Sequence, residues 1–183
     1  MAEFIIQNLI PQKGDYRKMN EQNVTAGFNA PASLVQAKIS EGKAKTEMPV
    51  WKVLLLGIFA GMFIAFGASS SSLAIHAIEN PGVAKLIAGL IFPVGLMMIV
   101  FVGGELFTGN NLVMAFGAFD KKISWGDAAK VWVVSYIGNF VGCLILSLIF
   151  VWAGASGTGD YFAGFINNKL TIPMGQMLSL IHL

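Results

Sequence analysis

The sequence predicts an all-α integral membrane protein, and three observations support that prediction. Of its 183 residues, 55% are hydrophobic and only 12% are charged, whereas soluble domains carry roughly 25% charged residues. The mean hydropathy is +0.68. Charged residues are absent from residues 53–78, 86–104 and 131–159. Each of these stretches can hold the roughly 20 apolar residues with which a helix crosses a bilayer.

Residues 1–49 precede the apolar part of the chain and divide into two segments. Residues 1–28 mix apolar and charged residues without a clear period, and we expect an extension of unknown role. In residues 29–49, Asn29 and Pro31 are typical helix-start residues. The following Ala32–Ala44 stretch suits an amphipathic helix on the membrane surface, and an ordinary solvated lead-in helix fits equally well. Residues 50–183 form the predicted transmembrane domain.

The first predicted span is Val50–Ile75. Trp51 and Lys52 begin it, as expected of an aromatic belt and a lysine that reaches the interface. Its interior is rich in glycine and alanine, which let helices approach closely in lipid. His76 follows the span, where we expect a solvated interface residue and not a ligand.

The second predicted span, Val83–Val102, contains Pro93, which should kink it. A polar nonapeptide follows, and the chain then continues as a half-length helix, Leu112–Phe119. The nonapeptide is Gly103-Gly104-Glu105-Leu106-Phe107-Thr108-Gly109-Asn110-Asn111. Ionisable side chains and irregular backbone at membrane depth normally face protein or a water-filled path. We therefore interpret the nonapeptide as a break in a transmembrane helix that holds the functional site, because half-helices expose unpaired amides and carbonyls.

The third predicted span begins at Ser124, an N-cap candidate followed three residues on by Asp127, and runs to about Ala153. Asn139 lies between small residues on one face of this span. An interhelix hydrogen bond is the favoured role for Asn139, and lining a pore is the alternative. A loop over residues 154–168 follows, and the last ten or so residues begin a helix too short to cross a bilayer.

The distribution of charge gives an orientation and limits the partners. Most of the twelve basic residues precede the first span or lie between the second and third, so the positive-inside rule places the N-terminus in the cytoplasm. The net charge of +2 includes no basic patch that would call for nucleic acid. Cys143 is the only cysteine, so neither an intrachain disulfide nor a cysteine metal site is expected. No secretory signal peptide is visible, and the first span would act as an uncleaved signal.

The octapeptide Gly103 to Asn110 is similar to the signature of the formate/nitrite transporter family around its broken second helix. Further similar segments are Ala60 to Ala68, Ser124-Trp125-Gly126 and Gly138 to Gly142. The resemblance covers about residues 29–178. It implies an aquaporin-like helical bundle that forms pentamers of six-helix protomers, each with one narrow path. This chain would supply three complete spans and the start of a fourth.

The resemblance also implies site residues and a function. Thr108 would face the permeating anion, and Lys169 would attract anions at the outer vestibule, although a plain loop lysine is equally plausible there. Side chains that would form the constrictions are Phe92, Leu96, Leu106 and Phe107. Residues that would support the broken helix are Gly103, Gly104, Glu105, Gly109, Asn110 and Asn139. We expect Glu105 to anchor loop amides, because its carboxylate would repel an anion.

The implied function is passive transport of formate or nitrite across the inner (cytoplasmic) membrane, coupled to protonation of the anion and requiring no cofactor. Hydrosulfide or another weak-acid anion is an alternative substrate. The family histidine has no counterpart here, because His76 and His182 lie elsewhere. The tail Leu178–Leu183 departs from the family pattern, which suggests an N-terminal fragment and, as a further alternative, a non-conducting interaction subunit. An enzyme is not expected, since no nucleophile and base or metal cluster can be assembled.

Overall fold

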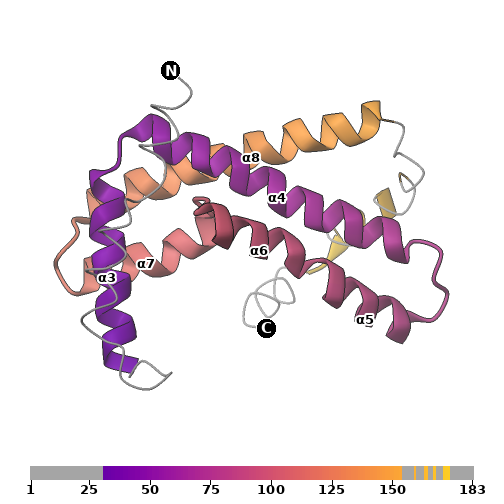
Figure 1. The fold of residues 1–183 in the computed structure, drawn as a ribbon, viewed down its shortest axis with the longest axis horizontal. Coiled ribbons are helices and arrows are strands. Elements are labelled where there is room, and N and C mark those ends of the chain that lie inside the picture. Colours follow the sequence, from indigo (N-terminus) through magenta and orange to yellow (C-terminus); the bar gives the residue numbers. More distant parts are fainter. Residues whose placement is uncertain (1–30, 154–158, 160–162, 165–166, 168–170, 174–183) are drawn as a thin grey trace.

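The computed structural model describes residues 31–153, together with residues 159, 163–164, 167 and 171–173. Its helices are α3 to α8, and the described residues contain no β-strand (Figure 1). The extension at residues 1–28, Lys169 and the tail with His182 lie outside the described residues, as does most of the predicted last helix. The predicted all-α membrane fold is confirmed, because three stretches are long and apolar enough to span a bilayer: Val50–Ile75, Pro81–Val102 and Trp125–Trp152.

Helices α4 (Val50–Ile75) and α8 (Trp125–Trp152) lie side by side along the length of the molecule (Figure 1). Glycines form the contact between them. The Cβ that an alanine would add at Gly57 lies 3.3 Å from the Cα of Gly138, and one added at Gly61 or Gly142 would overlap the backbone of the opposite helix. Lipid supplies no hydrophobic force between helices, so this close backbone approach is what holds the pair together.

The second span consists of α5 (Pro81–Ile91) and α6 (Pro93–Val102), separated at Phe92. The interruption coincides with Pro93, as its missing N–H requires. The span begins two residues earlier than predicted, because the side chain of Asn80 caps it. The Asn80 carboxamide oxygen accepts hydrogen bonds from the Gly82 and Val83 amides at 2.9 and 3.2 Å.

The break after the second span is shorter than the sequence indicated. Helix α7 begins at Phe107 and ends at Phe119, so only residues 103–106 are irregular and Thr108 to Asn111 are helical. The Asn110 amide donates to the Leu106 carbonyl at 2.9 Å and closes the first turn. Glycine and asparagine disfavour helix interiors, but the first turn has no full set of intrahelical bonds for them to weaken.

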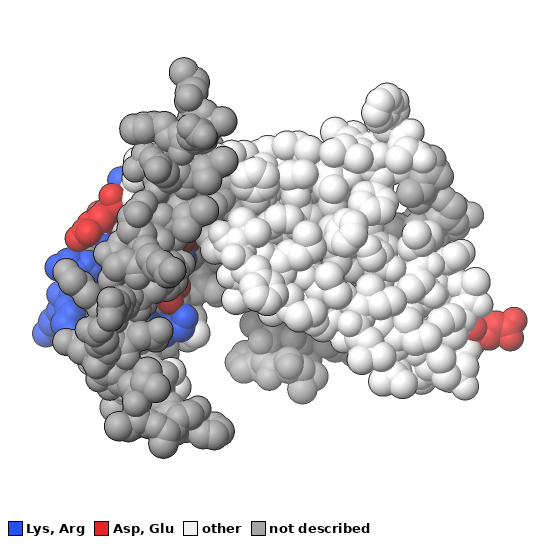
Figure 2. Space-filling model, viewed as in Figure 1, with Lys and Arg blue, Asp and Glu red and all other residues white. Residues whose placement is uncertain are grey.

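Helix α3 (Pro31–Glu47) crosses the ends of the other helices and packs on α7 (Figure 1). Ile39 is buried in this contact, and Gly42 lies against the backbone of Val113. Charged residues gather at this end of the molecule, and the long sides visible in Figure 2 are almost free of them. Helix α3 is therefore packed against α7 on one side, and its predicted place on the membrane surface stays a prediction.

We expect Gly61→Ala to destabilise the protein by about 1–3 kcal/mol, because its methyl group overpacks the α4–α8 contact. The thermal unfolding midpoint in detergent measures this change. Gly89→Ala on α5 is the matched control, since a Cβ there meets nothing within 4 Å, and it should be neutral or slightly stabilising. Equal midpoints for both variants would show that the glycine contact is not structurally important.

Candidate functional site

The irregular segment 103–106 is held by backbone hydrogen bonds at both of its ends. Gly103 adopts the left-handed conformation with φ 72°, which glycine reaches without strain. The Gly104 amide then returns to the Ile99 carbonyl at 2.8 Å, and the Glu105 amide donates to the Leu56 carbonyl of α4 at 3.3 Å. The segment is therefore an ordered turn attached to the first span.

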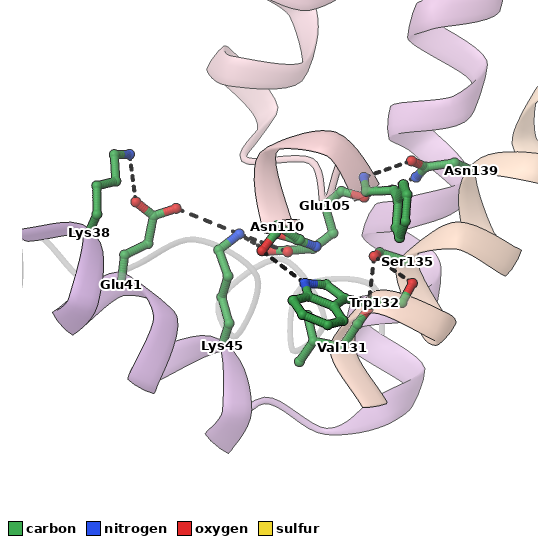
Figure 3. Close-up of polar contacts among 10 residues, drawn as sticks. Lys38, Glu41, Lys45, Glu105, Asn110, Val131, Trp132, Ser135 and Asn139 are labelled. Atoms are coloured by element: carbon green, nitrogen blue, oxygen red, sulfur yellow. Dashed lines mark hydrogen bonds and ion pairs between the residues drawn. The ribbon is translucent and has the colours of Figure 1, made fainter. Parts of the chain in front are cut away.

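The side chain of Asn139 connects three elements at this turn (Figure 3). Its Oδ1 accepts from the Phe107 amide at 2.9 Å, one of the amides that the start of α7 leaves unpaired. Its Nδ2 donates to the carbonyls of Gly57 and Glu105, both at 2.9 Å. The sequence left two roles open for Asn139, an interhelix hydrogen bond and lining a pore, and the structure shows the interhelix hydrogen bond.

Glu105 is paired with Lys45 of α3. The Lys45 Nζ lies 2.8 Å from Oε1 and 2.7 Å from Oε2 of Glu105, whose side chain is only 5% exposed. The pairing offsets part of the cost of burying the carboxylate. The sequence predicts that Glu105 anchors loop amides. Its carboxylate instead binds the Lys45 ammonium, and Asn139 contacts the loop backbone.

A groove of about 340 Å³ lies beside the turn, between α3, α6 and α7. Six of the residues proposed from the sequence line it: Leu96, Gly103, Gly104, Leu106, Gly109 and Asn110. Charged side chains in its lining come from α3 alone and are Lys38, Glu41 and Lys45. The groove thus combines apolar walls, the polar turn and a charged end.

Three of the proposed path residues do not line this groove. Phe92 and Thr108 are exposed, and Phe107 packs edge-on against Tyr136 of α8 with ring centroids 5.3 Å apart. Lys169 lies outside the described residues. The described part of the chain therefore brings Leu96 and Leu106 to one surface and leaves Phe92, Phe107 and Thr108 apart from it.

Asn110 is 1% exposed, and its Nδ2 has no hydrogen-bond partner among the described residues. Its backbone carbonyl accepts from Trp132 Nε1 at 3.2 Å. An unpaired buried amide is costly, by about 1–3 kcal/mol.

Residues of α3 line the groove, but the sequence pattern did not predict that they belong to the site. One signal was available, because a carboxylate at membrane depth requires a partner and Glu41 and Lys45 have the helical i, i+4 spacing. Nothing in the sequence placed Lys45 next to residue 105. The described residues hold no group of three or more His, Cys, Asp or Glu side chains suited to a metal ion, and His76 Nδ1 lies 2.8 Å from the Leu73 carbonyl oxygen.

A helical membrane protein with an interrupted span and a groove at the interruption has the architecture of membrane transporters and channels. Residues 32–180 match the family described as formate/nitrite transporter. The chain belongs to the formate/nitrite transporter family, as the sequence motifs predicted.

Relatives support the same assignment. The chain is 34% identical over 155 residues to a probable formate transporter of Methanothermobacter thermautotrophicus, a match that covers 82% of this chain and 57% of the relative. It is 33% identical over 132 residues to the formate channel FocA of Escherichia coli strain K12, covering 71% and 46%. This chain thus spans about half the length of these relatives. These relatives are described as a probable formate transporter and a formate channel.

A solved structure described as an FNT family ion channel is similar in fold. Its TM-score is 0.64 at 21% sequence identity, and the match covers 68% of this chain and 51% of the other. At this identity the likeness shows the fold alone.

Replacing Asn139 by alanine should leave the Phe107 amide and the Glu105 carbonyl without this partner and remove the additional hydrogen bond to the Gly57 carbonyl. We expect a loss of at least about 2 kcal/mol of stability, since each unsatisfied buried group costs about 1–3 kcal/mol. Thermal unfolding in detergent measures the loss. Asn111→Ala, which removes the same side chain one turn into α7, should cost clearly less, and comparable losses would contradict the role assigned to Asn139.

Lys45→Met should destabilise the protein by about 3–5 kcal/mol, because it leaves the Glu105 carboxylate buried without a cation. Adding Glu105→Met to this variant should restore much of the loss, which a double-mutant cycle of unfolding midpoints would measure. The control is Lys122→Met, which breaks an exposed pair with Asp120 worth at most about 1 kcal/mol. Additive effects of the two buried substitutions would contradict the pairing.

Proposed function

We propose that this chain forms part of a channel or transporter for small monovalent anions, with formate or nitrite as the first candidates. The observation that carries the proposal is the groove at the helix interruption, because it places Leu96 and Leu106 beside the ordered turn. Similarity to relatives named as formate transporters and channels supports formate as the first substrate to test.

The path we propose does not bind the anion tightly. Moving a bare anion through an apolar constriction costs on the order of 20 kcal/mol in the ideal Born estimate, before relaxation and entry of water. A weak acid avoids much of this cost by crossing in its neutral form. We therefore propose that protonation accompanies transport, so that flux rises as the pH falls toward the pKa of the substrate.

We also propose an orientation, a membrane and an oligomeric state for the channel. The basic residues that precede the first span and lie between the second and third support a cytoplasmic N-terminus by the positive-inside rule. We propose the inner (cytoplasmic) membrane as the location. The family resemblance supports a homopentamer. On the family resemblance alone, we also propose that Thr108, which does not line the groove, meets the anion, with Phe92, Phe107 and Lys169 further along the path.

The protein produced from the complete gene, reconstituted in liposomes, should carry formate or nitrite faster than protein-free liposomes, and faster at pH 5 than at pH 8. Thr108→Val should reduce this flux by about 10- to 100-fold, the effect of losing one hydrogen bond to an ion. Thr46→Val on α3 is the matched control and should transport normally. Equal flux with and without protein would refute the function, and full activity of Thr108→Val would refute the role of Thr108.

A further inference from the structure

We propose that Glu41 controls the electrostatic potential of the groove and thereby limits the attraction of anions into it. The functional part of this inference rests on the proposed anion path. The electrostatic part rests on the contacts of α3 alone and can be tested without transport.

The charged side chains at this end of the groove form a row in which positive and negative charges alternate (Figure 3). Lys38 Nζ lies 2.7 Å from Glu41 Oε2, Lys45 Nζ lies 3.7 Å from Glu41 Oε1, and Lys45 in turn pairs with Glu105 at 2.7 Å. Two lysines thus meet two carboxylates, and the four charges sum to zero. Without Glu41, the same end of the groove would carry one net positive charge.

The two pairs in this row of charges differ in how exposed their side chains are to solvent. The Lys45 and Glu105 side chains are 13% and 5% exposed, whereas those of Lys38 and Glu41 are 47% and 39% exposed. The buried pair, Lys45 and Glu105, stabilises the fold. The exposed pair contributes little to stability, but its charges are the ones that an ion in the groove would meet through water.

Glu41 is therefore an acidic residue at the groove whose charge can be removed with little damage to the fold. A single charge at about 7 Å in water changes the local concentration of a monovalent ion about threefold. Ions of opposite sign change in opposite directions, and salt at about 1 M suppresses both changes.

Reactivity of a thiol in the groove measures this potential directly. Cys143, the only cysteine, is replaced by serine, and Gly109→Cys is introduced, because a side chain at Gly109 lines the groove and meets nothing within 4 Å. The thiol is then modified with a negatively charged and a positively charged methanethiosulfonate reagent. The quantity compared is the ratio of the two rates, which cancels differences in accessibility.

Adding Glu41→Gln should raise the ratio of the anionic to the cationic rate by about five- to tenfold at about 0.01 M salt, and this increase should disappear at about 1 M salt. Glu47→Gln is the matched control on the same helix and should leave the ratio within twofold, because Glu47 does not line the groove. An unchanged ratio in Glu41→Gln, or no modification by either reagent, overturns the proposal.

Formate flux in liposomes then tests the functional part. Glu41→Gln should raise the flux about threefold at low salt, with Glu47→Gln unchanged. If the wild-type protein carries no formate while the rate ratio still shifts, the proposed anion transport fails and the electrostatic role of Glu41 stands. If the wild type conducts and Glu41→Gln does not raise the flux, control of anion entry by Glu41 is refuted.

Discussion

The fold depends on satisfying the polar backbone where the second span is interrupted. A lipid environment offers no hydrogen-bond partners, so every amide and carbonyl exposed by the break must find one in the protein. Asn139 meets two of these needs with one side chain, because its carboxamide accepts from the Phe107 amide and donates to the Glu105 carbonyl, and it also donates to the Gly57 carbonyl of α4. A hydrocarbon side chain could meet none, and a hydroxyl has one donor for the two carbonyls. The interruption is thus stable at membrane depth because of a residue on a different span.

The Lys45–Glu105 pair extends this support to α3. A buried carboxylate attached to the turn needs a cation, and the basic residue comes from a helix that crosses the ends of the bundle. Because Glu41 and Lys38 lie on the same helix, one pairing brings further charges to the groove. The electrostatics of the groove therefore follow from how the turn is stabilised.

Periodicity, charge-free stretches and capping residues were sufficient to predict the helices. The first span has the predicted bounds, and the Ser124 hydroxyl caps α8 at the Asp127 amide. The start of α7 was placed five residues too late, because glycine and asparagine were interpreted as loop residues although a first helical turn tolerates them. The Lys45–Glu105 contact joins residues 60 positions apart, and a sequence pattern does not encode a pairing of that range. The family resemblance proposed Leu96, Leu106 and Phe107 together as path residues, and it could not show that only the two leucines line the groove while the Phe107 ring packs against Tyr136.

The glycine contact between α4 and α8 determines where Asn139 lies. Asn139 follows Gly138 directly, and Gly57 provides both the close contact to Gly138 and a carbonyl that Asn139 binds. If the two helices moved apart by the width of a methyl group, the carboxamide could not keep its bonds to α4 and to the turn together. The turn carries Leu106 and Glu105, so the same displacement would alter the groove and its charged end. Helix packing, the interrupted span and the groove therefore depend on one another, and the small residues between α4 and α8 determine the geometry of the groove.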